Sequence, residues 1–268
     1  MVSVAPTTTP PPQAHKRDFS PLAWGVGRIS SLLGTGSVFM AIPVFLCHVF
    51  HSLNAIGFIF VSYYFFVAGF YSSRSRLNSL LNILLFFLFY DLLYSFAFGN
   101  VYLFDYPVSW FLVVYLFLQL LYRYTSDLVF SISCLLFAVF LYVFGFDYVW
   151  YSSFVAMPLG LLFRYDWRLF LLTVPSFFLV FLFPSFPFST WFVIPFFLTL
   201  FLLFFWLLSS LFDFSFLRKY VFHFYLSHVF FLGLSGVSWI YSGTPSFIPV
   251  LFSFFAACFF SFCLTRRS

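Results

Sequence analysis

Residues 190–211 read TWFVIPFFLTLFLLFFWLLSSL, a stretch without one charged side chain. A helix that crosses the hydrocarbon core of a bilayer needs about 17 to 25 mostly apolar residues, so this stretch is long enough to span a membrane. The whole chain is 63% hydrophobic and 7% charged, whereas ordinary soluble domains are roughly 25% charged. The composition therefore predicts an all-α integral membrane protein with the bilayer as its solvent.

Apolar stretches of this kind follow one another along the chain, separated by short turns rich in Gly, Pro, Asn and Ser. We expect ten membrane-spanning helices, which together form one domain at 33–264. A Thr/Pro-rich flexible tail is expected at 1–32 and a short basic end at 265–268. The expected helices are 33–53, 55–72, 77–98, 108–122, 128–146, 148–163, 169–186, 190–211, 220–240 and 246–264.

The basic residues alternate with the stretches in a way that places all twelve on one side of a membrane. They occur in the N-terminal tail and after the second, fourth, sixth, eighth and tenth stretches: Lys16, Arg17, Arg28, Arg74, Arg76, Arg123, Arg164, Arg168, Arg218, Lys219, Arg266 and Arg267. Lys and Arg collect on the inner side of membranes. The pattern predicts a multi-pass protein with both termini inside, in a bacterial inner membrane or an organelle membrane. Because the basic residues are spread over many loops, no nucleic-acid partner is expected.

Ionisable side chains inside apolar stretches are functional candidates by default. His48 and His51 lie three residues apart and share one helix face. Imidazole has an unperturbed pKa of about 6.5, so His48 can serve as a general base, or the pair can be interfacial histidines near a helix end. Asp91 follows a long apolar run and is either a neutral, hydrogen-bonded group or part of a proton relay.

The segment 221–228 holds two more histidines, His223 and His228. Five residues apart is a poor match for one helix face, so joint metal binding is not expected. Tyr225 and His228 are three apart and can face the same space. The four cysteines show no metal-binding spacing, and we expect no metal site.

Two further features each carry two interpretations. Arg74 and Arg76 anchor the inner side, and they can also bind the phosphates of a cofactor, because the Arg fork matches phosphate geometry. Pro158 should kink its helix. The Ala156–Gly160 region is therefore either a cavity wall or an ordinary membrane-helix kink.

Several short phrases occur in a characteristic order: CHVFH at 47–51, FFVAGF at 65–70, the loop with Arg74 and Arg76, WFL at 110–112 and VFHFYLSH at 221–228. Over about residues 36–240 the chain resembles the membrane-bound acyltransferase-3 family, which moves acyl groups, usually acetyl, onto sugars and cell-surface polymers. Relatives carry an Arg eleven residues before the histidine of the first helix, and here that position is Ser37.

The resemblance implies acyl-CoA (acetyl-CoA) as donor, held near Arg74 and Arg76 on the inner side. The acceptor would be a hydroxyl of a carbohydrate or a lipid-linked sugar. His48 would act as general base, and Tyr225 or His228 would orient a reacting group.

Two other functions remain open on the sequence. One is a catalytically inactive scaffold subunit bound to other membrane subunits of a larger complex. The other is a transporter or proton pathway that uses His48, His51 and Asp91. An enzyme predicts that His48, Tyr225 and His228 converge on a cavity reached from the Arg74 side, whereas a scaffold predicts that they are scattered.

Overall fold

The computed structural model describes residues 21–72, 77–99, 109–146, 148–165, 175, 189–212, 214–237 and 246–265. This part of the chain is all-α, as expected, and contains no strand. Its elements are α1 (Pro21–Val49), α2 (His51–Tyr71), α3 (Leu77–Phe98), α4 (Ser109–Tyr124), α5 (Asp127–Val143), α6 (Tyr148–Tyr165), α8 (Ser189–Leu211), the 3₁₀ turn η2 (Ser215–Leu217), α9 (Arg218–Leu234) and α10 (Phe247–Thr265). The helix expected at 169–186 and the basic end at 265–268 lie outside the described residues, apart from Pro175 and Thr265.

Helix boundaries differ from the expected ones mainly where glycines decide them. α5 ends at Val143 and α9 at Leu234, before the predicted ends at 146 and 240, because Gly145 (φ 71°) and Gly236 (φ 66°) adopt the left-handed conformation that stops a helix. α1 begins at Pro21 instead of 33, so it extends into the segment predicted to be a flexible tail.

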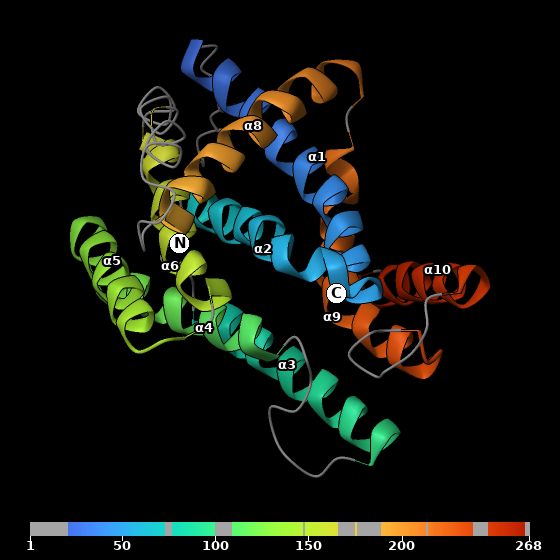
Figure 1. Cartoon of the computed structure of the whole chain (residues 1–268). Helices are drawn as coiled ribbons and strands as arrows, with labels where there is room; N and C mark the ends of the chain where they lie inside the picture. The colour runs from blue at the N-terminus through green and yellow to red at the C-terminus, as the bar shows by residue number, and fades with distance from the viewer. Residues whose placement is uncertain are drawn as a thin grey trace, which may run out of the picture.

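α2 runs through the middle of the molecule and crosses α6 closely (Figure 1). Two glycines make this crossing possible. A Cβ on Gly160 would overlap the carbonyl oxygen of Phe66, and a Cβ on Gly69 would overlap that of Met157. Small residues let membrane helices approach this closely. The structure therefore gives the Pro158 region a packing role at a helix crossing, in which Ala156 and Met157 are fully buried.

α1 and α9 pack side by side and run in the same direction. Near one end the backbone N–H of Phe214, just before α9, donates to the Thr35 hydroxyl at 3.2 Å. At the other end His48 lies beside His228. The two helices therefore stay in contact with the same relative offset over this length. These two contacts fix which side chains of α1 and α9 meet.

Polar contacts gather at one end of the helices. The Tyr71 hydroxyl lies 2.8 Å from the Ser30 hydroxyl, and the Arg218 guanidinium covers the Tyr71 ring, with Cζ 4.2 Å from its centroid. At the next residue, the Ser72 carbonyl accepts a hydrogen bond from Arg164 Nη1. The ends of α2 and α6, the beginning of α9 and the Ser30 region of α1 therefore lie together, and two of the chain's arginines lie with them.

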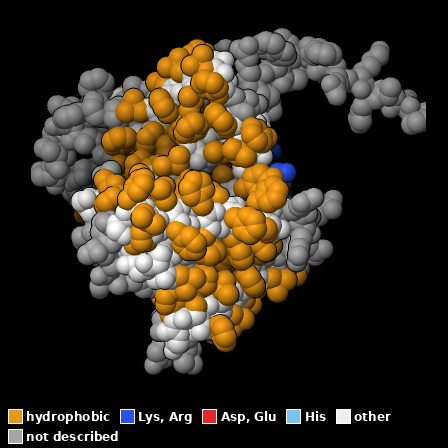
Figure 2. Space-filling view, turned by 90° about the vertical axis from the view of Figure 1, so that its right-hand side faces the viewer, with side chains coloured by type: hydrophobic (Ala, Val, Ile, Leu, Met, Phe, Trp, Pro, Cys, Tyr) orange, Lys and Arg blue, Asp and Glu red, His pale blue; other side chains and the backbone are white. Residues whose placement is uncertain are grey.

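The surface of the molecule is largely apolar. Figure 2 shows one face on which hydrophobic side chains dominate the described area and Lys and Arg appear only at its edge. Many large apolar side chains are exposed, among them Phe96 on α3 and Phe259 on α10. Soluble monomers rarely expose apolar patches of this extent, so the surface suits contact with lipid.

Among the described residues, three helical segments are long and apolar enough to cross a membrane by length and composition: Ile29–Val49, Leu80–Phe98 and Phe247–Thr265. The ten predicted spans are therefore seen only in part. The pair Phe197–Leu211 and Ser215–Leu234 passes the same test jointly, with a bend of 110° between its halves. The remaining apolar helices include shorter ones at Gly57–Tyr71, Ser109–Tyr124 and Asp127–Val143.

Candidate functional site

Two histidines far apart in the sequence meet between α1 and α9. His48 is the penultimate residue of α1. Its Nδ1 atom lies 3.1 Å from Nε2 of His228. Their ring centroids are 4.9 Å apart and the rings meet edge to face. This distance leaves no room for a water molecule between the two nitrogens, so the imidazoles contact each other directly.

Backbone carbonyls define the tautomers of this histidine pair. Nδ1 of His228 lies 3.2 Å from the Phe224 oxygen, and Nδ1 of His48 lies 3.0 Å from the Val44 oxygen. A carbonyl oxygen only accepts, so each Nδ1 of the neutral rings carries a proton. The His48 N–H is then shared between Val44 and Nε2 of His228. The basic lone pair of His48 is therefore on its Nε2 atom.

The histidine pair leads from the interior to the surface. His228 is completely buried and His48 is half-buried. Around His228, the ring of Phe224 stacks at 5.8 Å and that of Phe45 lies at 6.0 Å. Since aromatic side chains exclude water from the inner ring, only the outer member of the pair can meet a polar substrate from solvent.

Tyr225, the third predicted site residue, lies one helical turn before His228, with its ring 5.7 Å from that of the histidine. It is 4% exposed and packs against Phe111 at 4.5 Å and Tyr64 at 5.6 Å. Tyr225 also lines a cavity of about 270 Å³. The structure thus brings His48, Tyr225 and His228 together. Of the three, only Tyr225 lines this cavity, and it lies between the cavity and the histidine pair, so the predicted convergence of all three on one cavity is met only in part.

The cavity beside Tyr225 carries a cation at its far end. Its lining includes Ser37, Tyr64, Tyr71 and Arg218. Arg218 is exposed, and its guanidinium lies over the Tyr71 ring, an arrangement in which a cation–π contact holds the charge in place. The first turn of α9 therefore supplies an arginine to the same cavity as Ser37, the position at which the resemblance leads one to expect arginine.

The charge pattern of the sequence predicts Arg218 only as an inner-side basic residue, and not as a residue of the Tyr225 cavity. The resemblance implies an arginine on α1, eleven residues before His48. In the structure, the basic residue that lines this cavity is Arg218 of α9. The only sequence signal for it is its position seven residues before Tyr225, which places both on one face of a helix after two turns.

The other candidates lie elsewhere. Arg74 and Arg76 are outside the described residues, and the His51 side chain is not described. His223 is buried against α3, where the Tyr90 hydroxyl lies 3.4 Å from its Nδ1. Asp91 is buried on α3 next to Tyr90. His223 and His228 thus face different neighbours, as their spacing predicts.

Among the described residues, no group of three or more His, Cys, Asp or Glu side chains could hold a metal ion. Comparison of the chain with protein-family models, with curated proteins and with solved structures gives no significant match. The chemistry of the site is therefore inferred from its own geometry.

Proposed function

We propose that the chain is a multi-pass membrane protein whose ten helices leave both termini on the inner side. The apolar surface and the three described helical segments of spanning length support the membrane-spanning part of this proposal. A further support is the cluster at one end of the helices, where Arg164 and Arg218 contact the end of α2. Both belong to the connections that the charge pattern assigns to the inner side.

Within this membrane domain, we propose transfer of an acyl group from acyl-CoA to a hydroxyl of a carbohydrate or lipid-linked acceptor. The observation that carries the proposal is the 3.1 Å contact of His48 and His228 beside Tyr225. Nε2 of His48 removes the hydroxyl proton while the hydroxyl oxygen attacks the thioester carbonyl carbon. The positive charge that forms on His48 is stabilised by Nδ1–H donation to His228 and Val44.

In this mechanism, Tyr225 would donate its phenolic hydrogen in a hydrogen bond to the oxygen of the tetrahedral intermediate. The intermediate then collapses, the carbon–sulfur bond breaks, and the His48 imidazolium returns its proton to the departing CoA thiolate. The products are an ester and free CoA, and the enzyme regains its original protonation state.

The donor would approach from the Arg218 end of the cavity. A cavity of about 270 Å³ is below the roughly 300–1,000 Å³ of pockets that enclose drug-sized ligands. It suits the narrow acyl-thioester arm and leaves the nucleotide outside, where Arg218 can bind phosphate. Along α9, Arg218 precedes His228 by ten residues, about 15 Å of helix, so a long thin arm must connect phosphate to reacting carbon. Because Tyr225 separates the cavity from the histidine pair, the proposal requires the Tyr225 side chain to move aside for the thioester to reach Nε2 of His48. We place Arg74 and Arg76 near the same phosphates.

Binding of acetyl-CoA to the purified protein tests the donor part of this proposal. The purified protein in lipid nanodiscs is given labelled acetyl-CoA, and binding is measured with and without a mixture of membrane glycans and glycolipids. Arg218→Gln should weaken binding about tenfold, as for a lost charge-assisted hydrogen bond of roughly 1.5 kcal/mol. Arg123→Gln, at the end of α4 and outside this cavity, is the matched control. Equal binding by the two variants contradicts the donor assignment.

A scaffold subunit of a larger membrane complex is the second candidate. It is favoured by exposed apolar side chains such as Phe96, 93% exposed on α3, which could pack against other membrane subunits. Cross-linking in native membranes followed by sizing discriminates between the two. A stable assembly that binds no acetyl-CoA supports the scaffold.

A further inference from the structure

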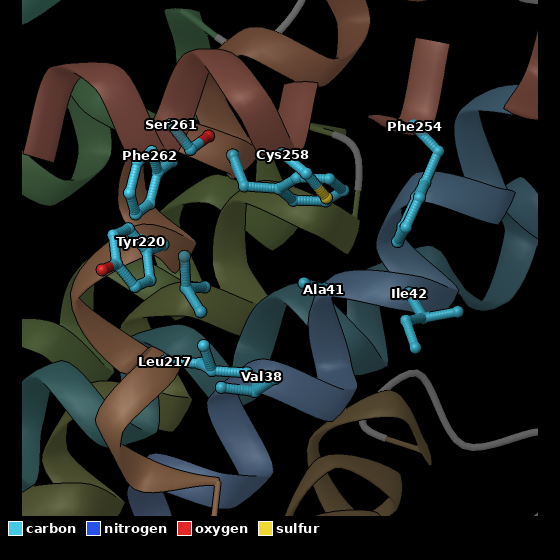
Figure 3. Close-up of a pocket in the computed structure, with 11 residues that line it drawn as sticks. Val38, Ala41, Ile42, Leu217, Tyr220, Phe254, Cys258, Ser261 and Phe262 are labelled. Atoms are coloured by element: carbon cyan, nitrogen blue, oxygen red, sulfur yellow. The ribbon is translucent and has the colours of Figure 1, made fainter. Parts of the chain in front are cut away.

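A second cavity, distinct from the one beside Tyr225, lies between α1, α9 and α10 (Figure 3). Its volume is about 340 Å³. Side chains that point into it include Val38 and Ile42 of α1, Leu217 at the end of η2, and Phe254 and Cys258 of α10. We refer to it as the α10 groove.

The α10 groove offers almost nothing to a polar ligand. The Ser261 hydroxyl donates to the Ala257 carbonyl at 2.6 Å within its own helix. Most other lining side chains are hydrocarbon or aromatic. Since a polar group placed there would lose its hydrogen bonds to water, the groove selects an apolar occupant.

The long dimension of the groove follows the helices. On α10 its lining extends from Phe254 to Phe262, and on the other side from Leu217, at the end of η2, to Phe224 of α9, which is about 10–12 Å of helix at 1.5 Å per residue. The deep end is closed by aromatic rings, with Phe254 5.5 Å from Phe224. One leaflet of the hydrocarbon core is about 15 Å deep, so the groove covers much of one leaflet.

A cation stands at the opposite end. Tyr220 lines the groove there and packs against Phe262 at 5.8 Å. The ammonium of the exposed Lys219 lies 4.9 Å from the Tyr220 ring centroid. Arg218, the preceding residue, faces the Tyr225 cavity instead. The two basic residues at the start of α9 therefore lie at different cavities: Arg218 lines the Tyr225 cavity, and Lys219 lies beside a residue of the α10 groove.

From this juxtaposition of an apolar groove and a cation we propose that the α10 groove binds one acyl chain of an anionic phospholipid from the inner leaflet, with Lys219 at its head group. A transmembrane helix of another subunit is the weaker match, because an apolar helix face offers no group to complement the Lys219 ammonium. A single hydrocarbon chain fits, and the lysine supplies the complementary charge.

Photoactivatable lipids test this site. The full-length protein is placed in nanodiscs that contain trace phosphatidylglycerol with a diazirine in its acyl chain, or phosphatidylcholine with the same chain. Labelled peptides are then mapped. Phosphatidylglycerol should label the 254–262 segment about fivefold more than phosphatidylcholine, the factor that corresponds to about 1 kcal/mol for one basic residue at the membrane surface. Lys219→Gln should abolish this preference.

Paired tryptophan variants separate the groove from the general lipid surface. Cys258→Trp fills the groove and should remove most labelling by either lipid. Cys263→Trp, on an exposed position of α10 that does not line the groove, should leave it unchanged. Equal labelling by the two head groups, equal effects of the two variants, or dimers formed by oxidation through Cys258 would each overturn the lipid site. None of these readouts requires acyl transfer.

Discussion

The histidine pair makes a quantitative prediction, because one hydrogen bond joins the proposed base to its partner. Replacing His48 with Leu removes the base and should lower acyl transfer by about 10²–10⁴-fold. Replacing His228 with Leu removes a neutral hydrogen bond at 3.1 Å from a buried position. A bond of this kind contributes about 0.5–1.5 kcal/mol, so we expect a loss of at most about tenfold.

The double variant shows whether His48 and His228 act as a unit. Once His48 is absent, His228 has no base to orient. The double variant should therefore transfer no more slowly than His48→Leu alone, although the single losses multiplied together would be larger. The assay is acetyl-CoA-dependent labelling of acceptor in nanodiscs, with acetyl-CoA binding measured in parallel. Losses that multiply fully, or full activity of His48→Leu, would refute the mechanism.

Two further predictions concern the fold and the topology. Gly160→Ala should cost about 1–3 kcal/mol of stability by overpacking, because its Cβ would lie 1.9 Å from the Phe66 carbonyl oxygen of α2. Gly34→Ala should cost less, because its Cβ would lie 2.8 Å from its nearest neighbour, the Cβ of Ser215. Thermal unfolding in detergent compares the two variants, and equal stability of Gly160→Ala and wild type would contradict the crossing. A membrane-impermeant thiol reagent should modify Ser126→Cys from the inner side and Phe146→Cys from the outer side, in a background whose own cysteines are replaced by serine; modification of both from one side would contradict the proposed span by α5.

Much of the helical order could be read from the sequence because charges and turn residues bound apolar runs. The helix expected at 77–98 is Leu77–Phe98, and that expected at 190–211 is Ser189–Leu211. The beginning of α1 could not be read, because residues 21–36 are rich in Gly and Ser, which are weak helix formers. Tertiary contact accounts for the last part of this segment, since the Ser30 hydroxyl lies 2.8 Å from the Tyr71 hydroxyl and Leu32 is buried.

The spatial arrangement of the site was harder to predict than the identity of its residues. His48, Tyr225 and His228 were each selected by chemistry and by resemblance, but their convergence depends on α1 and α9 running in step from Thr35 and Phe214. Uniform hydrophobicity hides which face of each helix turns inward, because lipid and protein interior demand similar side chains. For the same reason the sequence could not tell that Arg218 faces the cavity that Ser37 lines.

Stability measurements on the histidine variants also separate an enzyme from a scaffold. Replacing His48 with Leu removes the hydrogen bond to Nε2 of the fully buried His228, at a cost of about 1–3 kcal/mol for an unsatisfied buried group. Replacing His228 with Leu costs less, because the half-buried His48 keeps its contact with the Val44 carbonyl. In the double variant that cost disappears, and apolar groups of similar volume fill the space among Phe45 and Phe224. Such paired replacements are often neutral or stabilising, so the double variant should be at least as stable as wild type.

A scaffold gains nothing by keeping two buried nitrogens that leucines could replace without loss. An enzyme keeps them because the reaction needs a base, and sites of this kind commonly trade stability for activity. A double variant that is stable but inactive would therefore favour catalysis as the reason for the pair. A double variant less stable than either single variant would show instead that His48 and His228 are held together for structural reasons.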